Sequence, residues 1–203
     1  MIDLHGIISA YRGSPELGAL VEGRTASALT FAGRYRLVDF ALSSMKAAGV
    51  YNVDVVMQKD YQSLMDHIGS GKDWDLARRS GGIKILPPYI TMFDSSAPGV
   101  NRSRLDALKG AVNFIKRCSE DYIVMSDCDV ICNINFKAII EDHIKNKADI
   151  TMAVKTMTLT EGQAAANVLF ASDESGRITD VLPYPKNFTG EADVVLNIVV
   201  MRT

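Results

Sequence analysis

Short apolar runs alternate with amphipathic stretches along most of the chain. Five of these runs have the length and the β-branched content of strands, and we predict strands at 4–9, 52–58, 82–86, 121–126 and 149–155. Apolar residues at helical spacing predict helices over 37–48, 105–115 and 136–144, the first ended by Gly49 and the third capped by Asn135. This alternation is typical of a mostly parallel sheet covered by helices on both faces.

The last part of the chain follows a different pattern. Residues 167–172 and 177–184 read as a hairpin around a turn that contains Gly176, and 193–203 read as one more apolar strand. The length of 203 residues fits one domain, which we place at 1–203. Because the sequence stops directly after a strand that nothing follows to cover, we expect it to be part of a longer chain.

Composition and charge exclude several classes of function. The net charge is −2 with no dense basic run, which argues against a nucleic-acid partner. The chain has neither a secretory signal nor an apolar run of membrane-spanning length, so we expect a cytoplasmic protein without a membrane partner. Three clustered cysteines do not make a disulfide framework.

Open sheets of this kind bind ligands at the carboxyl ends of their strands, which directs attention to 9–33, 58–63 and 126–133. The first of these loops has too few glycines to cradle a phosphate and carries Glu16, so an ordinary connection is favoured. Asp127 and Asp129 directly follow a predicted strand, where they suit either a Mg²⁺ site or a simple strand end. The residues alone leave these two interpretations open.

Histidines and cysteines give weaker signals. His5, His67 and His143 are isolated in the sequence, which favours structural or surface positions over catalytic roles. Cys128 and Cys132 are too close to supply two independent ligands on a strand-to-loop segment, and no second pair accompanies them, so a zinc site is not expected.

The segment 31–43, FAGRYRLVDFALS, carries more information. It resembles the FGGKYRLIDFxLSN segment of bacterial glucose-1-phosphate adenylyltransferases (ADP-glucose pyrophosphorylases), and the resemblance continues at 58–68, 85–87, 105–108 and 129–136. It implies an α/β fold of the Rossmann-like nucleotidyltransferase type, with a mixed, mostly parallel sheet flanked by helices in an α/β/α arrangement. It also implies that the chain corresponds to the N-terminal part of such a protein, without the family's C-terminal left-handed β-helix.

The departures from the family lie at the chemistry. Where active subunits have a GGxGxRLxPLT loop, this chain has the segment 9–15, SAYRGSP, and Ala26 stands where an RAKP segment carries its lysine. An alanine cannot stabilise the charge that develops during nucleotidyl transfer. The family's GTAD segment keeps only Asp106, and its EKP segment aligns with 183–185, which lack the acid and the lysine. Asp129 matches the family's Mg²⁺-holding aspartate.

This combination resembles the regulatory GlgD-type subunits of the family, which implies a non-catalytic subunit of glycogen biosynthesis that forms a hetero-oligomer with a catalytic partner. No catalytic residue is assigned. The remnant nucleotide or sugar-phosphate pocket comprises Arg12, Arg24, Gln58, Asp106 and Asp129. Mg²⁺ is expected only if a nucleotide binds, with Asp129 as its ligand.

Two alternatives stay open. The first is an active sugar-1-phosphate nucleotidyltransferase that makes ADP-glucose from ATP and glucose 1-phosphate, with Arg12 or Arg24 replacing the lysine, since a guanidinium group can clamp phosphate. The second is a sensor that binds a nucleotide or sugar-phosphate effector through Gln58, Asp106 and Asp129 without turnover.

Overall fold

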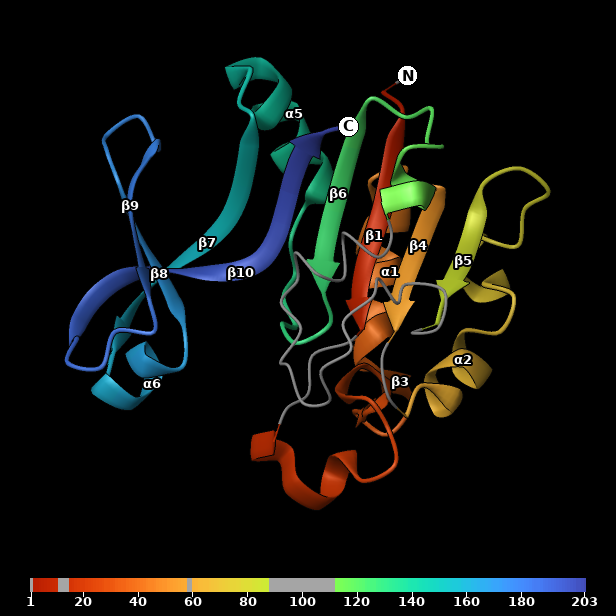
Figure 1. The fold of residues 1–203 in the computed structure, drawn as a ribbon, viewed down its shortest axis with the longest axis horizontal. Helices are drawn as coiled ribbons and strands as arrows, with labels where there is room; N and C mark the ends of the chain where they lie inside the picture. Colours follow the sequence, from red (N-terminus) through yellow and green to blue (C-terminus); the bar gives the residue numbers. More distant parts are fainter. Residues whose placement is uncertain (1, 11–14, 58–59, 88–111) are drawn as a thin grey trace. The chain divides into compact units, whose positions relative to one another are not determined.

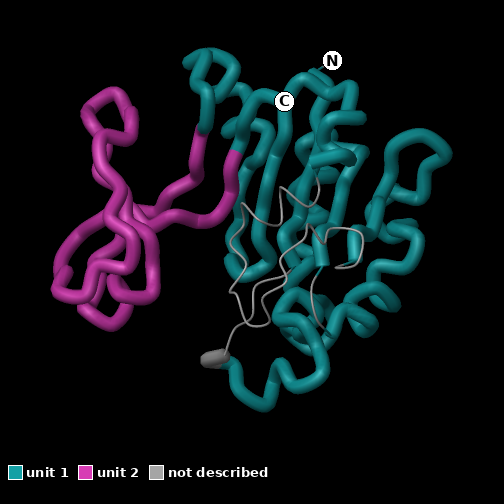
Figure 2. Tube along the Cα trace, viewed as in Figure 1, with its two compact units in different colours: residues 1–150, 200–203 teal, residues 151–199 magenta. Residues whose placement is uncertain are grey.

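The computed structural model describes residues 2–10, 15–57, 60–87 and 112–203, which form two compact units (Figure 2). Unit 1 contains residues 1–150 and 200–203, and unit 2 contains residues 151–199.

Unit 1 is built on a parallel sheet (Figure 1). Its strands lie in the order β5-β4-β1-β6, and each neighbouring pair is parallel. Their bounds are β1 (Leu4–Ala10), β4 (Asn52–Met57), β5 (Gly82–Leu86) and β6 (Tyr122–Asp127). The central strand β1 is buried along its whole length, as its near-continuous apolar sequence requires. These four strands agree with the sequence prediction.

Helices and short turns join these strands. The two longer helices are α1 (Leu37–Ala47) and α5 (Phe136–Asn146), which contact each other. As predicted, Asn135 caps α5, and its side chain accepts a hydrogen bond from the Ala138 amide at 3.3 Å. The remaining elements of unit 1 are η1 (Pro15–Val21), η2 (Ala26–Ala28), β2 (Thr30–Phe31), β3 (Tyr35–Arg36), α2 (Gln62–Ile68) and η3 (Lys72–Trp74).

Close packing of α1 on the sheet depends on Gly6. A Cβ atom at this position of β1 would lie 2.8 Å from Met45 Sδ and 3.0 Å from Val50 Cγ1, both of which are buried. The helix and the turn after it therefore approach the strand to a distance that only glycine permits without repacking.

Unit 2 is mainly antiparallel. β8 pairs with both β9 and β10, and β7 pairs with β10. The bounds are β7 (Ile150–Leu159), α6 (Glu161–Ala165), β8 (Val168–Ser172), β9 (Ile178–Pro183) and β10 (Gly190–Arg202), so the ends of β7 and β10 extend into unit 1. A small core contains Leu159, Ala164, Leu169 and Val194.

The mixed, mostly parallel sheet with flanking helices confirms the predicted fold class. β7 is longer than its predicted counterpart and runs to Leu159, and β10 begins at Gly190 rather than Asp193. Most of the predicted helix over 105–115 lies outside the described residues. Its last part, 112–115, is described and is helical. All three cysteines are free. No helix in the described ranges is long and apolar enough to cross a membrane.

Candidate functional site

The carboxyl ends of β1, β4 and β6 lie side by side, as the parallel register requires. Ser9 is opposite Asp127, and Ala10 is opposite Met57. Of the five residues predicted to line a remnant pocket here, Arg12, Gln58 and Asp106 lie outside the described residues. Arg24 and Asp129 are described, and both are exposed.

The segment that contains Ala26 lies against the end of β6. Ala26 is 8% exposed and Ser27 is 5% exposed, and the Ser27 side chain hydrogen-bonds the buried thiol of Cys128. The position that the family resemblance assigns to a lysine is therefore a buried methyl group beside the strand end. The hydroxyl of Thr25, the residue directly before Ala26, is buried and has no hydrogen-bond partner in the described part of the chain.

Carboxylates dominate the electrostatics of this edge. Burial first, and then the negative charges of Asp127, Asp129 and Asp39, raise the pKa of Cys128 to about 12, against the hydrogen bond from Ser27. The thiol therefore stays protonated at neutral pH and does not act as a nucleophile. These carboxylates repel an approaching phosphate, and a divalent cation or a lysine would offset that repulsion.

Carboxylate oxygens are the ligands that Mg²⁺ prefers, usually one or two of them together with substrate phosphates. Asp129 is exposed directly after β6, so its side chain fits that role when a nucleotide supplies the remaining oxygens.

Two segments that resemble the family meet at the start of α1. The Arg36 amide donates to Asp39 Oδ2 at 2.9 Å, and Asp39 Oδ1 lies 2.6 Å from His67 Nε2 on α2. The Arg36 guanidinium donates to both the carbonyl and the hydroxyl of Ser63. His67 also contacts the edge of Trp74. This network fixes α2 against α1, which gives His67 the predicted structural role, although it is not isolated.

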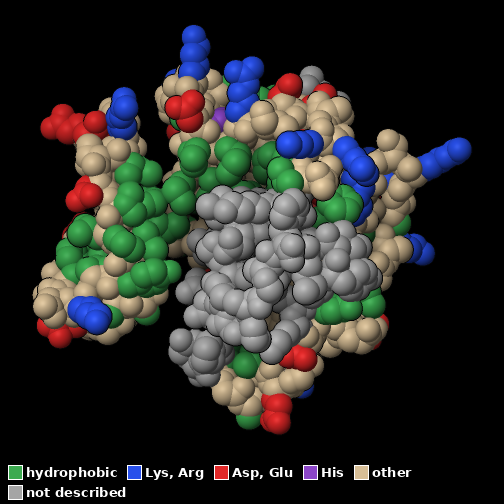
Figure 3. All heavy atoms as spheres, in the orientation of Figure 1, with side chains coloured by type: hydrophobic (Ala, Val, Ile, Leu, Met, Phe, Trp, Pro, Cys, Tyr) green, Lys and Arg blue, Asp and Glu red, His purple; other side chains and the backbone are tan. Residues whose placement is uncertain are grey.

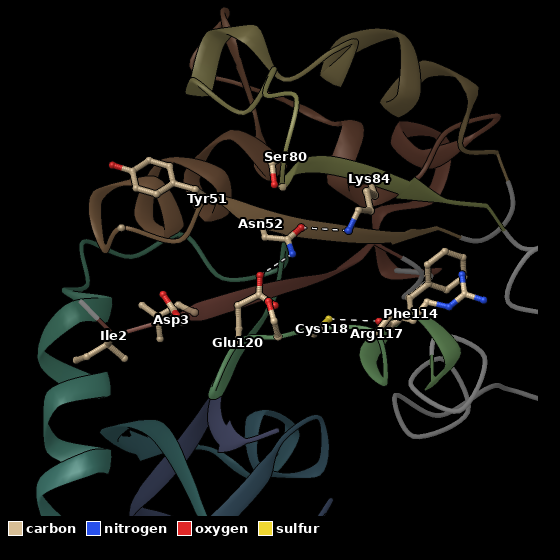
Figure 4. A pocket seen from close by; sticks show the side chains of 14 residues that line it. Ile2, Asp3, Tyr51, Asn52, Ser80, Lys84, Phe114, Arg117, Cys118 and Glu120 are labelled. Atoms are coloured by element: carbon tan, nitrogen blue, oxygen red, sulfur yellow. Dashed lines mark hydrogen bonds between the residues drawn. The ribbon is translucent and has the colours of Figure 1, made fainter.

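The other end of the parallel strands holds a cavity of about 490 Å³ (Figure 4). Its lining includes Asn52 and Lys84 near the starts of β4 and β5, and Cys118 and Glu120 just before β6. Sequence reasoning did not find this region, because it directed attention to the carboxyl ends. His5, which we expected to be isolated, is fully buried here and pairs with Asp54 at 3.2 Å.

Comparisons with known proteins agree with the fold. A solved structure of a putative glucose-1-phosphate thymidylyltransferase from Bacillus anthracis, in complex with a sucrose, superposes with a TM-score of 0.73 at 16% identity. The match covers 98% of this chain and 71% of that one, and at this identity it supports the fold alone.

Curated relatives are similar in sequence over part of their length. The glycogen biosynthesis protein GlgD of Geobacillus stearothermophilus is 38% identical over 147 residues, which are 72% of this chain and 42% of the relative. A glucose-1-phosphate adenylyltransferase of Fervidobacterium nodosum is 32% identical over 187 residues, 92% of this chain and 44% of the relative. The chain thus spans less than half the length of these relatives.

The family model described as nucleotidyl transferase matches residues 17–196, which include α1, the central strands β4 and β6, and most of unit 2. The chain therefore belongs to the nucleotidyl transferase family.

Proposed function

We propose that this chain is the nucleotidyltransferase-like part of a non-catalytic regulatory subunit of glucose-1-phosphate adenylyltransferase, which acts in glycogen biosynthesis by assembling with a catalytic subunit. The observation that carries the proposal is Ala26. Its side chain is buried beside the end of β6, at the position where the family resemblance implies a lysine. Removal of a group that stabilises developing charge typically costs two to three orders of magnitude in rate.

The field at the same edge supports the proposal. Asp39, Asp127 and Asp129 all act on Cys128 as negative charges, so the edge disfavours a bound triphosphate unless cations neutralise it. Asp129 can hold a Mg²⁺ ion that arrives with a nucleotide. A site of this kind binds a nucleotide or sugar-phosphate effector more readily than it turns one over, because binding needs only charge neutralisation.

An uncovered apolar strand in unit 2 supports assembly. β9 is exposed at every position, and it ends the strand order of the sheet in the described part of the chain. Val181 and Leu182 are 50% and 38% exposed, and as neighbours in a strand they face opposite sides. Figure 3 shows apolar side chains gathered on the surface of unit 2. Apolar edge strands are usually covered by another element, because they otherwise promote aggregation.

Co-expression with the catalytic subunit of the same organism tests assembly. We expect the two chains to co-purify as one complex, whose mass light scattering measures. Val181→Lys should weaken the complex at least tenfold, because it places a charge in the apolar contact. The matched control Glu174→Lys adds a lysine in the turn before β9 and should leave the complex intact. Separate elution of the two wild-type chains would contradict the proposal.

The second candidate function is residual nucleotidyl transfer, which the exposed carboxylate of Asp129 favours. Pyrophosphate release by the chain alone from ATP and glucose 1-phosphate, abolished by Asp129→Asn, would establish it and overturn the non-catalytic role. Calorimetric binding of ATP without pyrophosphate release would instead identify the edge as an effector site.

A further inference from the structure

His5, Cys118 and Glu120 converge at the amino end of the sheet, opposite the edge that the family resemblance concerns. Cys118 and Glu120 line the cavity (Figure 4), whereas His5 belongs to β1 and does not line it. One ligand atom from each of the three side chains lies within 4.8 Å of the other two. Imidazole, thiolate and carboxylate together make a donor set that binds transition metals, and the set is independent of the proposed function.

Asp54 orients the imidazole of His5. Asp54 Oδ2 lies 3.2 Å from His5 Nε2, and both side chains are at most 2% exposed. A carboxylate can only accept a hydrogen bond, so Nε2 is the donor of this pair, and in the corresponding neutral tautomer Nδ1 offers its lone pair to a cation. This carboxylate–histidine arrangement is the one that typically accompanies a metal-ligating histidine.

The Nδ1 lone pair faces the other two groups. Cys118 Sγ lies 3.4 Å from Nδ1, and Glu120 Oε2 lies 4.0 Å from it. In a tetrahedral Zn²⁺ site with ordinary bond lengths, neighbouring ligand atoms are roughly 3.4–3.6 Å apart. Sγ and Nδ1 are already at this spacing, whereas Glu120 Oε2 has to approach Nδ1 by roughly half an ångström and Sγ by up to about an ångström, which a side-chain rotation can supply.

One oxygen of Glu120 is buried and has no hydrogen-bond partner within the described ranges. Oε1 accepts from Asn52 Nδ2 at 2.7 Å, and Asn52 Oδ1 accepts in turn from Lys84 Nζ at 3.3 Å (Figure 4). Oε2, on the side of His5, is left without a donor. A buried carboxylate oxygen without a partner is costly, and a cation at the centre of the cluster would satisfy it.

The carboxylate of Glu120 favours its charged form, whereas the thiol of Cys118 has to lose its proton before it can bind a metal. Burial opposes ionisation of Glu120, but the hydrogen bond from Asn52, backbone amides and His5 together hold its pKa below the usual value. Burial, followed by the negative charges of Glu120 and Asp54, raises the pKa of Cys118 to about 11, against Lys84. The thiol is thus protonated when no cation is present, and it loses its proton when a metal binds.

We propose that His5 Nδ1, Cys118 Sγ and Glu120 Oε2 form a Zn²⁺ site, with Asp54 as the positioning residue for the imidazole. Mg²⁺ and Ca²⁺ prefer oxygen ligands, whereas Zn²⁺ accepts nitrogen, sulfur and oxygen in one tetrahedral site. Three protein ligands leave a fourth position. Since Cys118 and Glu120 line the cavity and His5 does not, that position opens into the cavity, where water or a small anion would occupy it.

Titration of the chelator-stripped chain with ZnCl₂ tests the site. We expect one Zn²⁺ per chain by calorimetry, at least tenfold weaker binding in Cys118→Ser and Glu120→Gln, and a 10–100-fold loss in Asp54→Asn. Cys132→Ser is the matched control, because Cys132 follows β6 at the opposite end of the sheet and should leave the affinity unchanged.

Co²⁺ gives a readout that does not depend on affinity. With CoCl₂ we expect a sulfur-to-cobalt charge-transfer band in the wild type, Asp54→Asn and Cys132→Ser, and no such band in Cys118→Ser. Circular dichroism of each variant checks that it folds. The absence of stoichiometric Zn²⁺ binding, or a Co²⁺ band that survives in Cys118→Ser, would overturn the proposal.

Discussion

Replacement of His5 by leucine separates the two members of a buried pair. The His5 and Asp54 side chains are 0% and 2% exposed, and their closest atoms are 3.2 Å apart. Leucine has a similar volume, so the change removes the hydrogen bond with little loss of packing. It leaves a carboxylate in the interior whose other oxygen, Oδ1, already has no partner in the described part of the chain.

The magnitude follows from burial. Removal of one partner of a buried pair typically costs about 3–5 kcal/mol when the group left behind is charged, because that charge stays in the interior uncompensated. Cys118 contributes little to this cost, since its thiol keeps the Phe114 carbonyl at 3.3 Å as an acceptor. We therefore expect His5→Leu to lower the free energy of unfolding by about 3–5 kcal/mol.

The double variant His5→Leu/Asp54→Leu provides the comparison. Replacement of a buried pair by apolar residues is often neutral, so we expect it to lie within about 1 kcal/mol of the wild type. Denaturant unfolding in the presence of EDTA excludes any effect of a bound metal. Trp74 is the single tryptophan and is buried in unit 1, so its fluorescence reports this unit. A decrease of less than about 1 kcal/mol in the free energy of unfolding of His5→Leu, or a double variant as unstable as the single one, would refute the reasoning.

Three further predictions concern the backbone and pH. Ala32 has a φ of 51°, so Ala32→Gly should raise the stability by about 1 kcal/mol, seen as a higher midpoint in thermal unfolding; an unchanged midpoint would contradict this. Gly6→Ala should lower the free energy of unfolding by about 1–3 kcal/mol, because the new methyl group clashes with Met45. At Gly162 a methyl group would meet no neighbouring atom of the described residues within 4 Å, so Gly162→Ala should be neutral or stabilising. Equal effects of the two variants would refute the packing argument. Burial lowers the pKa of His143 from 6.5, against the negative charge of Asp149, so the free energy of unfolding should fall as pH drops through about 6.5. This dependence of stability on pH, measured by denaturant titrations, should be weaker in His143→Asn. An identical dependence in the wild type and the variant would count against the reasoning.

Local patterns predicted the strands of the parallel sheet well, because a buried strand needs a short run of apolar, β-branched residues. The apolar stretches that became β1 and β6 could hardly form anything else. The N-cap of α5 was equally predictable, since Asn135 directly precedes the residues with helical spacing of apolar side chains. The short hairpin of β2 and β3 was not predicted, because each strand has only two residues and its turn uses Ala32 in a left-handed conformation.

The cluster at the amino end of the sheet could not be predicted from local patterns. His5 and Cys118 are 113 positions apart, and only the parallel register of β1 with β6 brings them together. The resemblance to a known family drew attention to the opposite edge. At that edge the resemblance identified the replacement of the family's lysine by Ala26. The predicted pocket residues Arg12, Gln58 and Asp106 lie outside the described residues, so their predicted roles stay predictions.

The rate of pyrophosphate release from ATP and glucose 1-phosphate tests the proposed regulatory role most directly. It should be measured for this chain alone, for the catalytic subunit of the same organism alone, and for the two together. We expect no release by this chain and a higher rate for the mixture than for the catalytic subunit alone. Release by this chain alone that Asp129→Asn abolishes, or a mixture no faster than the catalytic subunit, would contradict it.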